Sequence, residues 1–493
     1  MTGKRTKVDG KSDDAPPDAD LPGLPRRASL ADTLRVARDV LGVTIAKGIF
    51  IRRYGVVALA ARAGLDRRAV MRMADLRRRY GPGPLVLRVP FMPQAIVLDH
   101  AQVGPLLERA PRPFMPASDE KRAALAHFEP DVALASRGAA RERRRALNDQ
   151  ALESDRPTHS CADRFGAVIE EEIGTLAGRS VSEGTPLDWS TFQTGWNRTV
   201  RRIVLGNGAT DDDELTALLD QLRRAGNWAM LRPRRTRLLR RFQDRLAGHL
   251  ERAEAGSLAA ALMARGGREA MAADPTPGGE ATDQVTHWLF AADPGGMATF
   301  RALALLATHS DALDGARGEI GDASPDPSRS SVPPSAGHLR AAILESLRLW
   351  PTTPAILRET VRDVEWGGRT MRAGTNLTVL APWHHRDPAL PHADSFQPAL
   401  WLGSDGRHGS RADQSVETVN DVGVRGALVP FSAGPATCPA HHLVPLLGAL
   451  ALAAMLRRRT VELLEGASLR RDRPLPATLD NAALAFRLAP HPS

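Results

Sequence analysis

The stretch Phe431-Ser432-Ala433-Gly434-Pro435-Ala436-Thr437-Cys438-Pro439-Ala440 decides the fold of this 493-residue chain. It stands directly before an apolar run at 443–456, which predicts a long buried helix. Glycine and proline constrain the loop, and Cys438 stands at the mouth of the helix, where the helix dipole and free N–H groups favour a thiolate and lower its pKa. A buried thiolate is a metal ligand, whereas a free cysteine is often a small packing residue. The rest of the sequence decides between these interpretations.

A second landmark lies upstream, in Glu345-Ser346-Leu347-Arg348, within a segment whose apolar residues recur at helical spacing. The step of three residues puts the carboxylate and the guanidinium on one helix face, where they can pair. Further landmarks follow in order: Pro351, Arg358, Arg372-Ala373-Gly374-Thr375, His384-His385-Arg386-Asp387-Pro388, Phe396-Gln397-Pro398 and then the cysteine loop.

The order and spacing of these landmarks resemble the cytochrome P-450 superfamily, the haem-thiolate monooxygenases. The similarity is best from about residue 285 onward and weaker, but in register, from residue 80. It implies a mainly α fold with small peripheral β-sheets, in which haem b lies between a long distal helix and the helix after the cysteine loop. Cys438 is then the iron ligand, and Phe431, Arg144 and Arg358 bind the cofactor.

The two arginines are predicted as partners of the haem propionates, because buried carboxylates are usually met by arginine. Arg144, in the cluster 141–145, lies where the family's helix beneath the haem carries such a cation. A solvated charged face is the alternative for Arg144. Arg358 occupies the matching place on the strand after the Glu345/Arg348 helix. Those last two residues are predicted to form a structural lock.

The sequence also departs from the family pattern around the cysteine loop and the Glu345/Arg348 lock. Ala436 replaces the usual cation two residues before the cysteine, and Ala440 replaces the usual glycine two residues after it. The segment 398–401 reads Pro-Ala-Leu-Trp and lacks the arginine that normally joins the lock. We expect weaker haem anchoring and a weaker lock, with Arg407 or Arg425 as candidate replacements. His384 and His385 are predicted to lie in a surface loop, with an approach to the haem edge as the alternative.

The largest departure lies on the helix predicted at 282–309, which should cross the distal face of the haem. The family pattern there is small, Gly, any residue, acid, Thr, whereas this chain has Ala291-Ala292-Asp293-Pro294-Gly295-Gly296. The acid and the alcohol that manage proton delivery are therefore replaced by Pro294 and Gly295. Proline should kink the helix, and the two glycines should leave free space above the haem. We predict that Asp293, Pro294, Gly295 and Gly296 form the catalytic segment.

Composition limits the alternatives. Lys and Arg number 66 against 57 Asp and Glu, a net charge of +9, and the surplus is spread over many predicted helices. Nucleic-acid binding is therefore not predicted, and an acidic protein partner is favoured. Only Cys161 and Cys438 occur, which argues against a disulfide scaffold and against a cysteine-rich metal site.

The chain is predicted to comprise a disordered tail at 1–30 and a single haem-thiolate catalytic domain at 31–493. Charged residues interrupt the apolar region 40–65, and no stretch reaches the roughly 20 apolar residues of a membrane span. That region is either an amphipathic helix packed on the enzyme or a helix that touches a membrane surface. We expect a cytoplasmic protein.

The remaining pattern gives coarse secondary structure. Segments 85–89 and 95–98 resemble a short hairpin, 460–464 and 482–488 two strands of a small sheet, and 324–334 and 404–423 loops. Helical periodicity is found at 136–151, 164–176, 191–205, 213–224 and 235–253.

The predicted function is hydroxylation of an apolar small molecule with O2 and electrons from a ferredoxin or flavoprotein. The missing acid and alcohol keep open a peroxide-using enzyme or a non-hydroxylating oxidation such as coupling, cyclisation or rearrangement. A haem-binding protein without turnover is a third interpretation. The substrate loops should lie at 112–136 and 206–228, whose apolar residues suit either a pocket or ordinary core.

Overall fold

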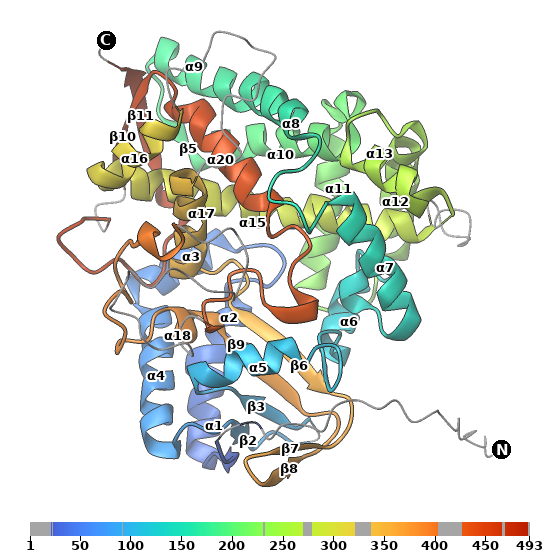
Figure 1. The fold of residues 1–493 in the computed structure, drawn as a ribbon, viewed down its shortest axis with the longest axis vertical. Coiled ribbons are helices and arrows are strands. Elements are labelled where there is room, and N and C mark those ends of the chain that lie inside the picture. The colour runs from blue at the N-terminus through green and yellow to red at the C-terminus, as the bar shows by residue number, and fades with distance from the viewer. Residues whose placement is uncertain are drawn as a thin grey trace.

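The computed structural model describes residue 21 and residues 23–90, 92–229, 232–269, 279–320, 337–402, 426–465 and 469–491. Helices dominate it, with a six-stranded sheet at one end and a three-stranded sheet near the other (Figure 1). The predicted class, mainly α with small peripheral sheets, is confirmed. The predicted loops at 324–334 and 404–423 lie outside the described residues, as do Arg407 and Arg425.

The α-helices before the long distal helix are α1 (Leu30–Val36), α2 (Val43–Ala46), α3 (Tyr54–Arg62), α4 (Leu65–Tyr80), α5 (Val103–Glu108), α6 (Asp119–Leu125), α7 (Gly138–Ala151), α8 (Ala162–Ile169), α9 (Thr175–Glu183), α10 (Trp189–Leu205), α11 (Asp213–Gly226), α12 (Thr236–Arg252) and α13 (Leu258–Leu262). The later ones are α15 (Gly279–Thr308), α16 (Ser310–Ile320), α17 (Gly337–Leu349), α18 (Ala381–His385) and α20 (Leu443–Leu456). Each predicted helical segment thus contains a helix.

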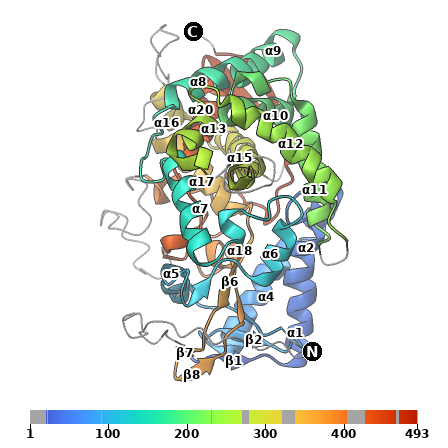
Figure 2. The ribbon, with the colours of Figure 1, turned by 90° about the vertical axis from the view of Figure 1, so that its right-hand side faces the viewer.

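Helices α15, α17 and α20 pack against one another, α10 packs against α15, and the four form the centre of the main core. In Figure 2, α15 is seen nearly end-on among its neighbours. Every residue of α20 except Val444 is buried, as its uniformly apolar sequence requires. The helix that follows the cysteine loop therefore lies in the most deeply buried part of the molecule.

The six-stranded sheet runs in the order β1, β2, β3, β9, β6, β4. Its strands are β1 (Arg26–Arg27), β2 (Leu85–Leu87), β3 (Gln94–Ile96), β4 (Phe114–Met115), β6 (Ala355–Thr360) and β9 (Asn376–Leu380). The predicted hairpin is present, with Leu85 opposite Ile96 in an antiparallel pair. Strand β6 pairs antiparallel with β9, and this pairing fixes the position of Arg358.

Two smaller sheets complete the fold. The predicted C-terminal strands are β10 (Arg459–Glu465) and β11 (Ala485–Pro490), and β5 (Leu187–Asp188) pairs with β11 from a distant part of the chain. Strands β7 (Val364–Trp366) and β8 (Arg369–Met371) form a two-stranded sheet.

The N-terminal region differs from the prediction. Leu21 is buried, β1 pairs in parallel with β2, and α1 begins at Leu30, so the last residues of the segment predicted as a tail take part in the fold. Residues 1–20 and 22 lie outside the described part. The region 40–65 is divided between α2 and α3, because Gly48 has φ +92° and a side chain there would collide with the carbonyl oxygen of Ile51. Ile45 and Ile49 are exposed.

Within the described ranges, no helix combines the length and the apolarity that crossing a membrane would take.

Candidate functional site

The cysteine loop is held on several sides. The Cys438 N–H donates to the carbonyl oxygen of Phe431 at 2.9 Å, which closes the loop on itself. Gly434, at φ +65°, lies against α5 so closely that an added Cβ would stand 2.5 Å from the carbonyl oxygen of Leu107. From α7, Arg145 donates to the carbonyl oxygen of Thr437. These contacts fix the position of the thiol relative to α20.

The protonation of Cys438 differs from the prediction. Burial raises the pKa of the Cys438 thiol, and the backbone N–H of Ala440 lowers it only in part. The predicted lowering of this pKa by the helix mouth is therefore wrong for the polypeptide alone, because desolvation outweighs the single hydrogen bond. A bound metal cation supplies the missing stabilisation, since it deprotonates a coordinating thiol outright.

Three cations meet beside this loop. Arg358 on β6 is buried and donates to the Ser432 hydroxyl at 2.9 Å, while its Nε has no partner among the described residues. Burial and the neighbouring Arg141 lower the pKa of Arg358 to about 10. Burial, Arg358 and Arg141 together lower the pKa of Lys121 to about 7. We call Lys121, Arg141 and Arg358 the cation cluster.

No carboxylate of the described chain forms an ion pair with the cation cluster. Arg141 donates to the carbonyl oxygen of Ala133 at 3.0 Å, and Lys121 donates to that of Pro116 at 2.7 Å. Uncompensated buried cations are costly unless an anion joins them. The cluster therefore fits the carboxylates of a bound group next to the Cys438 loop.

Arg144 is placed differently from Arg141, although both lie on α7. Its guanidinium pairs with Asp131 at 2.7 Å and with Glu280 at 2.9 Å, and it donates to the Ser136 hydroxyl. These partners neutralise Arg144 and tie α7 to the start of α15. Its cofactor role stays a prediction, whereas Arg141, one turn earlier, is the α7 arginine that repels Arg358.

Glu345 and Arg348 form a fully buried bidentate ion pair on α17, with N–O distances of 2.6 and 2.9 Å. Arg348 also donates to the carbonyl oxygens of His385 and Ser395. The third position of this lock is filled by Trp401, whose indole N–H donates to Glu345 at 2.8 Å. Trp401 thus takes a place for which the sequence suggested a distant arginine.

The predicted surface position of the two histidines is wrong, because both are fully buried. His385 approaches the Arg348 carbonyl oxygen at 3.3 Å through Nδ1, and its Nε2 accepts from the Val429 N–H at 3.1 Å. Burial and Arg348 lower the pKa of His385 to about 3. His384 meets His100 at 3.0 Å. His385 therefore connects the lock helix to the segment that leads into the cysteine loop.

The middle of α15 packs closely against Trp196 of α10. The Trp196 indole N–H donates to the carbonyl oxygen of Ala292 at 2.8 Å. A Cβ on Gly296 would lie 2.6 Å from the Trp196 ring, so the predicted free space beside Gly296 is already filled by that ring. Gly295 has room for a Cβ, with Val444 at 3.5 Å.

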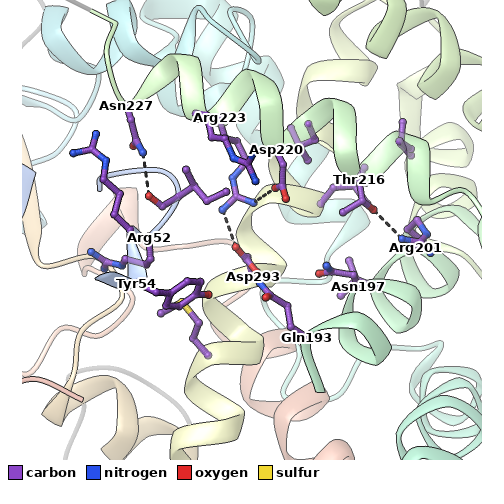
Figure 3. Close-up of a pocket in the computed structure, with 18 of the residues that line it drawn as sticks. Arg52, Tyr54, Gln193, Asn197, Arg201, Thr216, Asp220, Arg223, Asn227 and Asp293 are labelled. Carbon is purple, nitrogen blue, oxygen red and sulfur yellow. Dashed lines mark hydrogen bonds and ion pairs between the residues drawn. The ribbon is translucent and has the colours of Figure 1, made fainter. Parts of the chain in front are cut away.

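Asp293 is engaged by two neighbouring helices. Its carboxylate pairs with Arg223 of α11 at 2.8 Å and accepts from the amide of Gln193 of α10 at 3.2 Å. Figure 3 shows these side chains in the wall of a pocket of about 460 Å³. This pocket lies between α10, α11, α15 and residues 51–54.

A titratable pair also links α15 to the segment after α6 and was not found from the sequence. His287 contacts Glu129 at 2.9 Å, and Glu129 is fully buried. Burial raises the pKa of Glu129, and Glu129 raises the pKa of His287. The histidine and the glutamate are far apart in the sequence, so no local pattern reveals them.

The sequence also matches known proteins. A family model described as Cytochrome P450 matches residues 282–479. Cyclooctat-9-en-7-ol 5-monooxygenase of Streptomyces melanosporofaciens is 33% identical over 198 residues, which are 39% of this chain and 39% of that protein. Cyclooctatin synthase of the same organism is 29% identical over 160 residues, 32% and 31% of the two chains. The chain thus spans well under two thirds of these relatives' lengths.

Two solved structures share the fold. A cytochrome P450 designated CYP102L1 has a TM-score of 0.63 at 18% identity, over 85% of this chain and 98% of that one. Retinoic acid-bound cyanobacterial CYP120A1 has a TM-score of 0.61 at 17% identity, over 84% and 93%. Residues 282–479 are therefore similar in sequence to cytochrome P450, and the fold over most of the chain is that of two cytochrome P450 structures.

Haem is the cofactor that this family implies, and the residues present fit it. Cys438 offers a thiol at the head of α20, and the cation cluster offers buried positive charge, including the unpartnered Arg358 Nε, for two carboxylates. Phe431, partly buried against the main core, begins the same loop.

Proposed function

We propose that this protein is a haem-thiolate monooxygenase that oxidises an apolar small molecule with O2, using haem b and electrons from a ferredoxin or flavoprotein. The observation that carries the proposal is a direct contact between the cysteine loop and the cation cluster. Ser432 belongs to the Cys438 loop, and its hydroxyl accepts a hydrogen bond from Arg358, which has no carboxylate partner among the described residues. The name of the relative cyclooctat-9-en-7-ol 5-monooxygenase supports the reaction type.

Each residue has a stated task. Cys438 would hold the iron, with Phe431 beside it, and the cation cluster would hold the propionates. Thiolate-bound haem supplies O2 activation when present. Glu345 and Arg348 would act structurally, because their pairing fixes the chain that leads through His385 to the cysteine loop.

On α15, Pro294 has no N–H and so cannot donate to the carbonyl oxygen of Phe290. That oxygen can accept a hydrogen bond from a water molecule or a substrate hydroxyl. Asp293 would take part in proton delivery through its carboxylate, which Arg223 holds in place. Gly295 leaves room for a Cβ next to Val444, whereas Gly296 accommodates Trp196.

A second candidate is a haem-thiolate enzyme that uses peroxide or performs a non-hydroxylating oxidation. Pro294 and Gly295 favour it, because neither provides an acid or an alcohol for proton delivery. Product formed per reductant with O2, compared with product formed with hydrogen peroxide, distinguishes the two. The double variant Pro294→Glu/Gly295→Thr should shift turnover toward O2 under the first proposal.

The central experiment is the carbon monoxide difference spectrum of the reduced protein. Cys438→Ser should lose the red-shifted Soret band of a thiolate-bound haem, and Cys161→Ser, which changes the other partly buried cysteine, should keep it. If Cys161→Ser lost the band and Cys438→Ser kept it, the proposal would fall.

Haem retention tests the cation cluster. Arg358→Met and Arg141→Met should each weaken haem binding about tenfold or more, because a buried charge-assisted contact is lost. Arg144→Met should instead destabilise the fold, since it leaves Glu280 with less compensation. Haem titration of the apoprotein and denaturant unfolding measure the two effects separately. If Arg144→Met lost haem affinity and the other two variants kept it, Arg144 rather than the cation cluster would bind the propionates.

The proposed electron donor is tested by measuring how the rate of reduction depends on salt concentration. An acidic ferredoxin steered by basic residues should reduce the enzyme more slowly as ionic strength rises. Equal reduction rates from low to high salt would remove electrostatic docking from the proposal.

A further inference from the structure

The pocket of Figure 3 is separate from the cofactor residues. Its volume of about 460 Å³ lies within the usual range for a small-molecule site. Residues of α10, α11, α15 and the segment 51–54 line it, together with Asn227, Trp228 and Arg232 after α11, and neither Cys438 nor any member of the cation cluster does so. A ligand in this pocket would therefore contact neither Cys438 nor the cation cluster, although it would lie beside Asp293.

Positive charge dominates the lining. Six arginines, but only the two carboxylates of Asp220 and Asp293, face the pocket. Both carboxylates pair with a single arginine, Arg223. Arg201 pairs with Asp213, which lies outside the lining. The remaining four arginines are Arg52, Arg53, Arg224 and Arg232.

These four have no carboxylate partner among the described residues. Arg52 donates to the carbonyl oxygens of Gly48 and Thr352, and Arg53 lies 4.5 Å from the centre of the Trp228 ring. The side chains of Arg224 and Arg232 make no hydrogen bond or ion pair within the described chain. Four guanidinium groups around one cavity, without matching acids, create a strong preference for an anion.

The remaining lining defines the rest of the ligand. Apolar side chains from every wall face the same space, among them Ile51, Val200, Leu219, Leu289 and Met297. Inorganic anions gain nothing from such a surface, whereas an organic anion with a hydrocarbon body does. The lining thus combines a cationic part with an apolar part.

We propose that this pocket binds an amphipathic organic anion, a carboxylate or a phosphate monoester with an apolar body, with Arg224 and Arg232 contacting the anionic group. Guanidinium pairs oxygen anions of both kinds with two parallel hydrogen bonds. Asp293, in the same wall, precedes Pro294 on α15, so the bound anion would lie beside the proline-containing turn of that helix.

Octanoate, octyl phosphate and 1-octanol test the proposal in the full-length protein. Trp228 lines the pocket and is 42% exposed, so its fluorescence reports binding, and Trp228→Phe identifies its share of the signal. Calorimetry measures the affinities independently. At least one of the two anions should bind ten times more tightly than 1-octanol, and the stronger of the two identifies the head group. Equal affinity for 1-octanol and both anions would overturn the proposal.

The double variant Arg224→Met/Arg232→Met should weaken binding of the preferred anion at least tenfold. Both side chains are exposed, so the fold should tolerate the change. Arg240→Met, an exposed arginine of α12 outside the pocket, is the matched control and should bind as the unchanged protein does. Wild-type affinity in the double variant would contradict the assignment.

Cys438→Ser separates this proposal from the proposed function. Anion binding should persist in that variant, because Cys438 does not line the pocket. Loss of binding together with haem would show that the anion occupies the cofactor site instead, and would overturn the proposal of a separate pocket.

Discussion

The cysteine side of the molecule and the middle of α15 depart from the family pattern in different ways. Around α17 the two charged residues of the lock are kept, and a different residue, Trp401, completes their hydrogen bonds. On α15 the catalytic residue types themselves are replaced, and the helix is repacked against Trp196 and Arg223.

The difference reflects the cost of buried charge. Glu345 and Arg348 are fully buried, so loss of either leaves the other uncompensated. The middle of α15 imposes a weaker constraint, because the Trp196 indole N–H satisfies the Ala292 carbonyl oxygen and Arg223 pairs with Asp293 in the pocket wall. We expect changes on the cysteine side to cost more stability than changes on α15.

The largest effect should come from Glu345→Ala. It leaves Arg348 buried without its anion, and we expect a loss of about 3–5 kcal/mol in the free energy of unfolding, with little folded protein. Glu462→Ala breaks an exposed pair with Arg487 and should cost less than about 1 kcal/mol. Denaturant unfolding and soluble yield measure both. A stable Glu345→Ala protein altered only in turnover would break the comparison.

Trp401→Phe should have the next largest effect. It removes the indole N–H that donates to Glu345 but keeps an aromatic ring, and a hydrogen bond to a buried charge is worth about 1.5–3 kcal/mol. Trp401→Arg should recover part of the loss if arginine and tryptophan are equivalent at this place. An unchanged unfolding midpoint in Trp401→Phe would show that the indole does not belong to the lock.

On α15, Gly296→Ala should cost about 1–3 kcal/mol, because the new methyl group collides with the buried Trp196 ring. The matched control is Gly318→Ala on α16, where an added Cβ meets open space. That control should be neutral or stabilise by about 0.5–1 kcal/mol, since alanine is the better helix former. Equal effects of the two changes on thermal unfolding would argue against the Trp196 packing.

The smallest effect concerns pH. The pKa of His385 is about 3 in the folded protein, against an ordinary value of 6.5. As pH falls, the unfolded chain binds a proton at His385 that the folded chain refuses, so stability is lost on acidification. Between pH 7.5 and 5.5 this group should remove about 1.4 kcal/mol.

The contribution of His385 to this pH dependence is measured by comparing two proteins, the unchanged protein and His385→Gln. Their unfolding midpoints are determined across that pH interval. The variant has no titrating group at this position and should show a shallower pH dependence. Identical slopes would mean that His385 is as easily protonated in the folded state as in the unfolded state.

The helices and the lock could be predicted because their signals are local. The apolar run of α20 and the three-residue step from Glu345 to Arg348 each lie within one segment. The cation cluster could not be predicted completely, because Lys121, Arg141 and Arg358 come from three segments that only the fold brings together. The family resemblance favoured Arg144, and its ion pairs with Asp131 and Glu280 join segments that are distant in the sequence.

The prediction for His384 and His385 was wrong for a different reason. His-His-Arg-Asp-Pro has the composition of a polar surface loop, but α18 carries His384 and His385 into the interior, where His384 contacts His100 and His385 contacts backbone groups. Strand β5 has only two residues and leaves no periodicity to detect. Trp196 reaches α15 from α10, so its match to Gly296 is likewise invisible in the sequence.

In the proposed enzyme, the cation cluster would also couple cofactor loading to proton uptake. Lys121 has a pKa of about 7, so much of the apoprotein lacks this proton just above neutrality. An incoming dianion would raise that pKa and draw a proton from the buffer, so the measured heat of loading should depend on the buffer's ionisation enthalpy. By mass action, the loaded chain resists unfolding more than the empty one, and the margin grows with free haem concentration. Cells that make this protein faster than haem should therefore accumulate its least stable form.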